Sequence, residues 1–321
     1  MTDGSTKPSE NAPTAPFAFT SRDGLALRGT HYFARSSTAR SRRPVLCLAG
    51  LTRNGRDFEM IATALSAGPN PRDVYTLDMR GRGRSDFDRD WRNYSVLTEC
   101  ADVLDALTVL GLSDVAILGT SRGGLIAMAM MAVQPARVGL VMLNDIGPVI
   151  ETAGLARIAG YVGKLPPPKT WEEAENLVSR AIATEFPKID EATIATLARA
   201  WFNETADGRP VPGYDPNIAR TFSAAKGGVP ELWPQFKAMT RIPCLAIRGA
   251  NSDLLSAATL KRMAEMHPRF AAHTVPDEGH APLLRDRPTI EVVSAFLASF
   301  DETAHHGVRR PTAESNVAHA G

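Results

Sequence analysis

The sequence has few of the features that mark a membrane, secreted or metal-binding protein. No run of apolar residues is long enough to cross a bilayer, and no cysteine or histidine spacing is typical of a metal site. Residues 1–16 are polar and lack the apolar core of a secretion signal. The three cysteines, odd in number and set in apolar patterns, predict buried free thiols in a reducing compartment: Cys47, Cys100 and Cys244. We therefore expect a cytoplasmic protein.

The sequence also has no excess of charge of either sign. The 321 residues include 36 Lys and Arg against 35 Asp and Glu, which gives a net charge of +1. This balance excludes the strong field that attracts nucleic acid or an anionic membrane surface. Apolar residues make up 44% of the chain and charged residues 22%, as in ordinary globular proteins.

Short apolar runs alternate with helical patterns along most of the chain. Such runs are typical of parallel strands that are buried on both faces. They occur at residues 45–48, 74–77, 115–118, 138–143 and 243–248. Amphipathic segments such as Val96 to Leu110 lie between them. The alternation predicts an α/β fold with a mostly parallel central sheet flanked by helices.

This alternation stops near residue 149 and resumes near residue 241. No strand-like run appears in between, while Thr170 and Asp190 are placed to cap helices and Pro230 to begin a short one. We expect an inserted helical domain there. The predicted organisation is a disordered tail over 1–16, a first core part over 17–148, the insertion over 149–240, a second core part over 241–300 and a disordered tail over 301–321.

One short stretch carries the clearest chemical signal. In Gly119-Thr120-Ser121-Arg122-Gly123, a serine lies between an apolar strand pattern and a strong helix-forming segment. Glycines on both sides remove the Cβ atoms that would collide in so tight a turn. The helix behind the serine adds free N–H groups and a partial positive charge. We predict Ser121 as a nucleophile.

A catalytic serine needs a base, and the base needs an acid that orients it. His280 follows the last strand pattern and is preceded by a glycine, which favours it as the base. Two aspartates also follow strands. We expect Asp253 to be the acid, because serine, acid and histidine then follow a known chain order. Asp145 is the alternative acid, although a turn explains its place before Ile146-Gly147-Pro148 equally well.

The oxyanion of an acyl-transfer reaction needs two preorganised N–H donors. The amides of Arg122 and Leu51 are the candidates, one directly after the nucleophile and one in the loop after residues 45–48. The side chains of Arg53 and Arg122 could contact a substrate carboxylate or carbonyl, or could make structural hydrogen bonds. Aromatic residues are dense in the insertion, and its Trp201 and Trp233 could line a pocket or form the insertion's own core.

With these residues in view, the segment from Phe17 to Phe300 resembles the α/β-hydrolase superfamily. The serine turn, the glycine-rich Asp78–Asp86 loop, Asp253 and Gly279-His280 match its pattern, and residues 149–240 resemble its helical cap domain. Two positions differ from many members: Ala49-Gly50 stands where His-Gly is common, and Arg122 where an apolar residue or Gln is common. A serine at position 121 argues against hydrolytic dehalogenation.

The resemblance implies a serine hydrolase with a Ser121–His280–Asp253 triad and no cofactor. The expected substrate is a small or medium carboxylic ester, lactone or thioester. Two alternatives stay open, namely a hydrolase of carbon–carbon bonds in a diketone-like compound and a ligand-binding protein without turnover. A small molecule is the expected partner, without nucleic acid or a membrane span. Whether the chain is a monomer or a homodimer stays open.

Overall fold

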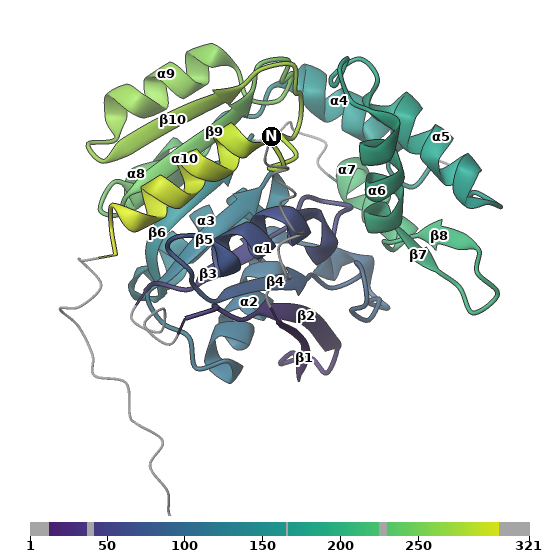
Figure 1. Cartoon of the computed structure of the whole chain (residues 1–321), viewed down its shortest axis with the longest axis horizontal. Coiled ribbons are helices and arrows are strands. Elements are labelled where there is room, and N and C mark those ends of the chain that lie inside the picture. Colours follow the sequence, from purple (N-terminus) through teal and green to yellow (C-terminus); the bar gives the residue numbers. More distant parts are fainter. Residues whose placement is uncertain (1–12, 37–41, 165, 225–229, 302–321) are drawn as a thin grey trace, which may run out of the picture.

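The computed structural model describes residues 13–36, 42–164, 166–224 and 230–301. Its centre is an eight-stranded sheet with the order β1-β2-β4-β3-β5-β6-β9-β10 (Figure 1). Strand β2 pairs antiparallel with β1 and β4, and the strands from β4 to β10 are parallel. The strands are β1 (Thr14–Thr20), β2 (Ala26–Tyr32), β3 (Val45–Leu48), β4 (Val74–Asp78), β5 (Val115–Thr120), β6 (Val138–Asn144), β9 (Cys244–Gly249) and β10 (Phe270–Val275). The α/β fold with a mostly parallel sheet is confirmed.

The apolar runs form the middle of this sheet because both of its faces are covered. In β3, Leu46 and Leu48 pack on one face, while Val45 and Cys47 pack on the other. This division follows from the two-residue period of a strand. All three cysteines are free and buried, as the sequence predicts.

Helices cover both faces of the sheet. The larger core cluster contains buried residues of α2, α3, α8 and α9, and the cluster on the other face contains those of α1 and α10. The bounds are α1 (Glu59–Ala67), α2 (Val96–Val109), α3 (Arg122–Val133), α8 (Trp233–Met239), α9 (Ala257–Met266) and α10 (Arg287–Ala298). The 3₁₀ helices η2 (Gly55–Phe58), η3 (Trp91–Asn93) and η4 (Pro135–Arg137) lie in the connections.

The segment between β6 and β9 forms a lobe to one side of the sheet (Figure 1). It has a small core of its own, built around α5 and α6. Its elements are α4 (Thr152–Tyr161), α5 (Trp171–Ile182), α6 (Glu191–Trp201), β7 (Phe202–Glu204), β8 (Pro210–Pro212), η5 (Pro216–Ala219) and α7 (Arg220–Ala224). Thr170 and Asp190 cap α5 and α6 as expected.

Two details of this segment differ from the sequence expectation. Strands β7 and β8 pair antiparallel, so the segment is not purely helical. Each strand has only three residues, which leaves no readable period. Helix α8 lies outside the lobe's own core, since Phe236 and Met239 are fully buried in the larger cluster of the sheet. The lobe's own elements therefore end before α8.

The described ends are also more ordered than expected. Thr14, Ala15 and Pro16, which the sequence predicts in a disordered tail, pair with β2 as the start of β1. Asp301, which it predicts in the second tail, accepts hydrogen bonds from Arg72 at 2.9 Å through both carboxylate oxygens. The rest of the two predicted tails, 1–12 and 302–321, lies outside the described residues.

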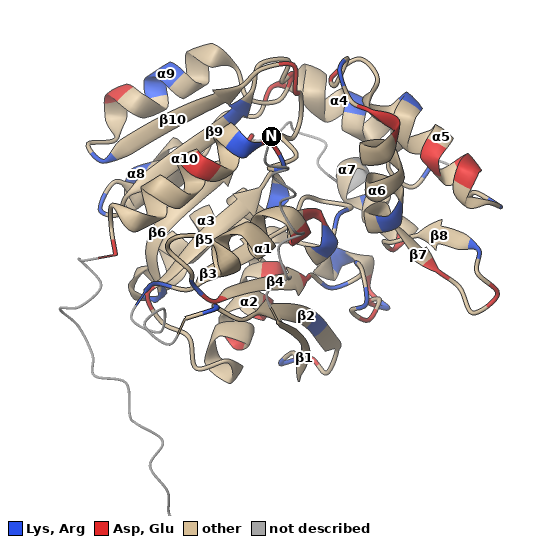
Figure 2. Cartoon of the chain, in the orientation of Figure 1, with Lys and Arg blue, Asp and Glu red and all other residues tan. Residues whose placement is uncertain are grey.

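Charged side chains of both signs are interspersed over the ribbon (Figure 2), as expected for a net charge of +1. Within the described ranges, no helix is both long enough and apolar enough to span a membrane.

Candidate active site

Ser121 occupies the sharp turn between β5 and α3. Its φ of 50° and ψ of −112° are unusual for a residue with a Cβ atom. The turn exists because its neighbours are glycines: a Cβ on Gly119 would lie 2.6 Å from the carbonyl carbon of Gly123, and one on Gly123 would overlap the carbonyl of Leu48. The serine therefore stands at the carboxyl end of a central strand.

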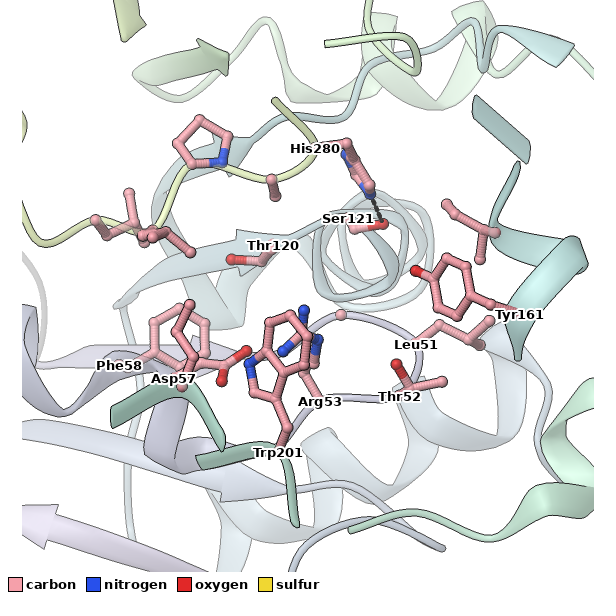
Figure 3. Close-up of a pocket in the computed structure, with 17 residues that line it drawn as sticks. Leu51, Thr52, Arg53, Asp57, Phe58, Thr120, Ser121, Tyr161, Trp201 and His280 are labelled. Carbon is pink, nitrogen blue, oxygen red and sulfur yellow. Dashed lines mark hydrogen bonds between the residues drawn. The ribbon is translucent and has the colours of Figure 1, made fainter. Parts of the chain in front are cut away.

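His280 lies between Ser121 and Asp145, and Figure 3 shows its hydrogen bond to Ser121. Its Nε2 is 2.9 Å from Oγ of Ser121, and its Nδ1 is 2.8 Å from Oδ2 of Asp145. The His280 side chain is 7% exposed, and that of Asp145 is fully buried. Asp145 also accepts hydrogen bonds from the amide of Gly249 and the hydroxyl of Ser252, which fix its carboxylate. The three side chains form one hydrogen-bonded line.

The expectation that Asp253 contacts His280 is wrong in this structure. The Asp253 carboxylate instead accepts hydrogen bonds from Arg157 of α4, at 2.7 and 2.8 Å, and this pairing lowers the pKa of Asp253. The reason lies in the sheet order. Strands β6 and β9 are neighbours, so Asp145 directly after β6 and the loop after β9 meet at one edge. Ser252 of that loop then binds Asp145, while Asp253 is directed toward the lobe.

The same edge carries a contact that sequence reasoning missed. Oε1 of Glu185, after α5, accepts a hydrogen bond from the backbone amide of His280 at 2.9 Å. Glu185 also forms an ion pair with Arg157 at 2.8 Å, and burial raises the pKa of its carboxyl group. The one trace of this contact in the sequence is the glycine before His280. A Cβ atom at Gly279 would overlap the Glu185 side chain.

The candidate oxyanion donors lie beside Ser121. Arg122 is the first residue of α3, where the N–H has no partner within the helix. Leu51 lines the cavity around Ser121, and its carbonyl accepts a hydrogen bond of 2.7 Å from Arg82, which holds this loop. The Arg122 guanidinium binds buried Glu99 at 2.7 Å and the carbonyl of Tyr94. Of the two roles that the sequence leaves open for the Arg122 side chain, the structure shows the structural hydrogen bonds.

A cavity of about 80 Å³ lies at Ser121, and a second of about 70 Å³ is lined mostly by residues of the lobe. Arg53, Tyr161, Trp201 and His280 line both. Trp233 lies elsewhere: it is partly buried and packs against the larger core cluster, with its ring edge-on to Phe236 and the centroids 6.1 Å apart. Of the two candidate tryptophans, Trp201 is at the site and Trp233 is not. In the described part of the chain, no cluster of three or more His, Cys, Asp or Glu residues is arranged to hold a metal ion.

The sheet order, the serine turn and the position of the histidine define an α/β-hydrolase fold. The model of the alpha/beta hydrolase family matches residues 45–295, and the chain belongs to this family. A solved alpha/beta hydrolase from Novosphingobium aromaticivorans superposes with a TM-score of 0.82 at 37% identity, over 89% of this chain and 99% of that one.

Two curated relatives are named as hydrolases. The chain is 32% identical to a 3-hydroxybutyrate-oligomer hydrolase of Cupriavidus necator, over 79% of this chain and 88% of that protein. It is 26% identical to a 2-(acetamidomethylene)succinate hydrolase of Mesorhizobium japonicum, over 74% of this chain and 81% of that protein. The expected superfamily is thereby confirmed, and hydrolysis is the activity that these relatives share.

Proposed function

We propose that this protein is a serine hydrolase that cleaves a small or medium carboxylic ester, lactone or thioester through an acyl-enzyme. The observation that carries the proposal is the hydrogen-bonded line from Ser121 through His280 to Asp145. A binding protein would not need a serine, a histidine and a buried aspartate in a row, each within 3 Å of the next.

The geometry supports a two-step reaction. His280 Nε2 takes the Ser121 proton while Oγ attacks the substrate carbonyl, and the same nitrogen then protonates the leaving group. Asp145 is buried and bound to Nδ1, so it holds the ring in orientation and stabilises its positive charge. In the second step, water activated by His280 attacks the acyl-enzyme and releases the acid.

The negative charge that develops on the carbonyl oxygen needs donors on the other side of the nucleophile. We assign this role to the backbone amides of Leu51 and Arg122. Their loops are held in place by side chains that take no part in the reaction, since Arg82 binds the Leu51 carbonyl and Glu99 binds the Arg122 guanidinium. Such fixed donors stabilise charge without reorganising during the reaction.

The lobe between β6 and β9 is assigned the role of a cap that shapes the substrate pocket. Tyr161 of α4 and Trp201 of α6 line the cavity at Ser121. A cap in this place excludes water and limits the size of the acyl or alcohol group. Oligomers of 3-hydroxybutyrate, the substrate named for the Cupriavidus relative, are esters and are the first substrates to test.

Labelling with a fluorophosphonate probe tests the nucleophile, and turnover of a 4-nitrophenyl ester series tests the reaction class. The expected result is labelling and ester cleavage by the wild-type protein and loss of both in a folded Ser121→Ala variant. We expect the rate to fall by roughly 10³-fold or more. Labelling of that variant at full strength on another residue would exclude Ser121 as the nucleophile.

A further inference from the structure

Buried arginines in this fold are paired with carboxylates. Arg72 binds Asp301, Arg80 binds Asp102, and Arg82 binds Glu99, each at 2.6–2.9 Å. Arg53, which is partly buried in the wall of the cavity at Ser121, departs from this pattern. Among the residues that the structure describes, Arg53 forms no ion pair, and its Nη1 atom is buried without a hydrogen-bond partner.

Arg53 is held inside the cavity that contains Ser121. Its backbone amide closes a turn on the carbonyl of Gly50 at 3.1 Å, in the loop that also carries Leu51. Its guanidinium lies over the indole ring of Trp201, below Ser121 and His280 in the view of Figure 3. This stacking fixes the plane of the guanidinium and leaves its N–H edge for hydrogen bonding.

An unpaired guanidinium in such a place is unfavourable without a ligand. Burial lowers the pKa of Arg53, since the charged form loses hydration that no partner replaces. An anion in the cavity would restore that interaction. A carboxylate fits best, because it accepts two parallel N–H bonds from a guanidinium edge.

Asp57 is the other charged residue of this cavity. It lies outside ion-pair distance of Arg53, its buried Oδ1 has no partner among the described residues, and burial raises the pKa of its carboxyl group. A carboxyl group whose protonated form is favoured is a poor counter-ion for Arg53. It is suited instead to a hydrogen bond with a polar group of the same ligand.

We propose that Arg53 binds a carboxylate of the substrate, so that the preferred substrates are esters bearing a free carboxylate. This inference rests on the proposed ester hydrolysis and specifies its substrate class. Arg53 lines both cavities, so the carboxylate can belong to the acid half or to the alcohol half of the ester.

Two substrate pairs separate these halves. The first compares the 4-nitrophenyl monoester of glutaric acid with the analogue in which an amide replaces the carboxylate. The second compares 3-acetoxybutyrate with 3-acetoxybutanamide. The wild-type enzyme should prefer the anion of at least one pair by about tenfold or more in kcat/KM, the size expected for a charge-assisted hydrogen bond. Equal rates, or a preference for both amides, would overturn the proposal while leaving ester hydrolysis intact.

Variants assign the preference to Arg53. Arg53→Gln should lose about tenfold or more on the preferred anion and only a few-fold on its amide, and Arg53→Lys should recover part of the loss. Arg56→Gln is the matched control, because Arg56 carries the same charge three residues away but lines neither cavity. Equal losses on anion and amide in Arg53→Gln would contradict the proposal.

Binding of glutarate, measured by calorimetry, gives a readout that does not depend on turnover. Wild type and Arg56→Gln should bind it, and Arg53→Gln should bind it at least tenfold more weakly. If the enzyme cleaved none of the esters, the proposed function would be rejected. Loss of glutarate binding in Arg53→Gln would still support the carboxylate site. Affinity that is unchanged in Arg53→Gln, or the absence of binding to wild type, would count against the site.

Discussion

The carboxylate of Glu185 accepts a hydrogen bond from the backbone amide of His280 at 2.9 Å. This contact joins the lobe to the loop that presents the candidate base. Arg157 extends the connection, since it binds both Glu185 and Asp253. The lobe is thus linked to the core through charged groups directly beside the site.

We expect Glu185 to act as a positioning residue for His280. Replacing Glu185 by Leu removes the acceptor, so kcat should fall by about tenfold, the equivalent of one hydrogen bond to a charged group, with a smaller change in KM. Glu185→Gln keeps an acceptor oxygen and should recover most of kcat. Steady-state kinetics on a 4-nitrophenyl ester measures both. If Glu185→Leu and Glu185→Gln had the same thermal stability and lost the same amount of kcat, the hydrogen bond to His280 would not be the cause of the loss.

Asp145 and Asp253 should differ sharply on substitution. Asp145→Asn alters the carboxylate that binds His280 and is proposed to orient it, so kcat should fall by roughly 10³- to 10⁴-fold without unfolding. Asp253→Asn breaks only the pair with Arg157 at a partly exposed site, so kcat should change by a few-fold at most. Circular dichroism checks folding, and kcat is compared on one ester. A larger loss of kcat in Asp253→Asn than in Asp145→Asn would show that Asp253 is the acid, as the sequence predicts.

Substitution of Trp201 should change substrate selectivity, whereas substitution of Trp233 should change stability. Trp201→Ala opens the cavity at Ser121, so relative kcat/KM across acyl-chain lengths should shift by several-fold. Trp233→Ala removes a partly buried ring that packs against the core and should lower the free energy of unfolding by ~2 kcal/mol, less than for a fully buried ring, with a parallel chain-length profile. Parallel profiles in both variants would remove Trp201 from the substrate pocket.

Glu278 predicts a pH dependence of stability. Burial raises its pKa to about 7, above the unfolded value, so the native state binds more protons between these two values. The ionised Glu278 carboxylate therefore destabilises the folded state. This destabilisation grows as the pH rises from the unfolded pKa and levels off above about pH 7. Glu278→Gln should be the more stable protein at pH 8, by up to ~2 kcal/mol after allowance for solvent, with the difference fading toward pH 4. Urea unfolding at pH 4, 6 and 8 measures it, and a constant difference would contradict the assignment.

The sequence by itself determined the sheet and the turn at Ser121. Apolar runs that are buried on both faces have few alternatives to parallel strands, and β3 to β6 lie where the runs predict them. The turn at Ser121 is equally local, since Gly119 and Gly123 are required by atoms within a few ångströms. The position of His280 after the last strand also followed from local pattern alone.

Only the tertiary structure decided which aspartate meets His280. Asp145 and Asp253 both follow a strand, and nothing in their local sequence separates them. The lateral order of β6 and β9 and the direction of the following loop place one at the histidine and the other at Arg157. The same holds for Glu185 and Trp201, because contacts between segments about 80 to 95 residues apart depend on how the lobe packs on the sheet.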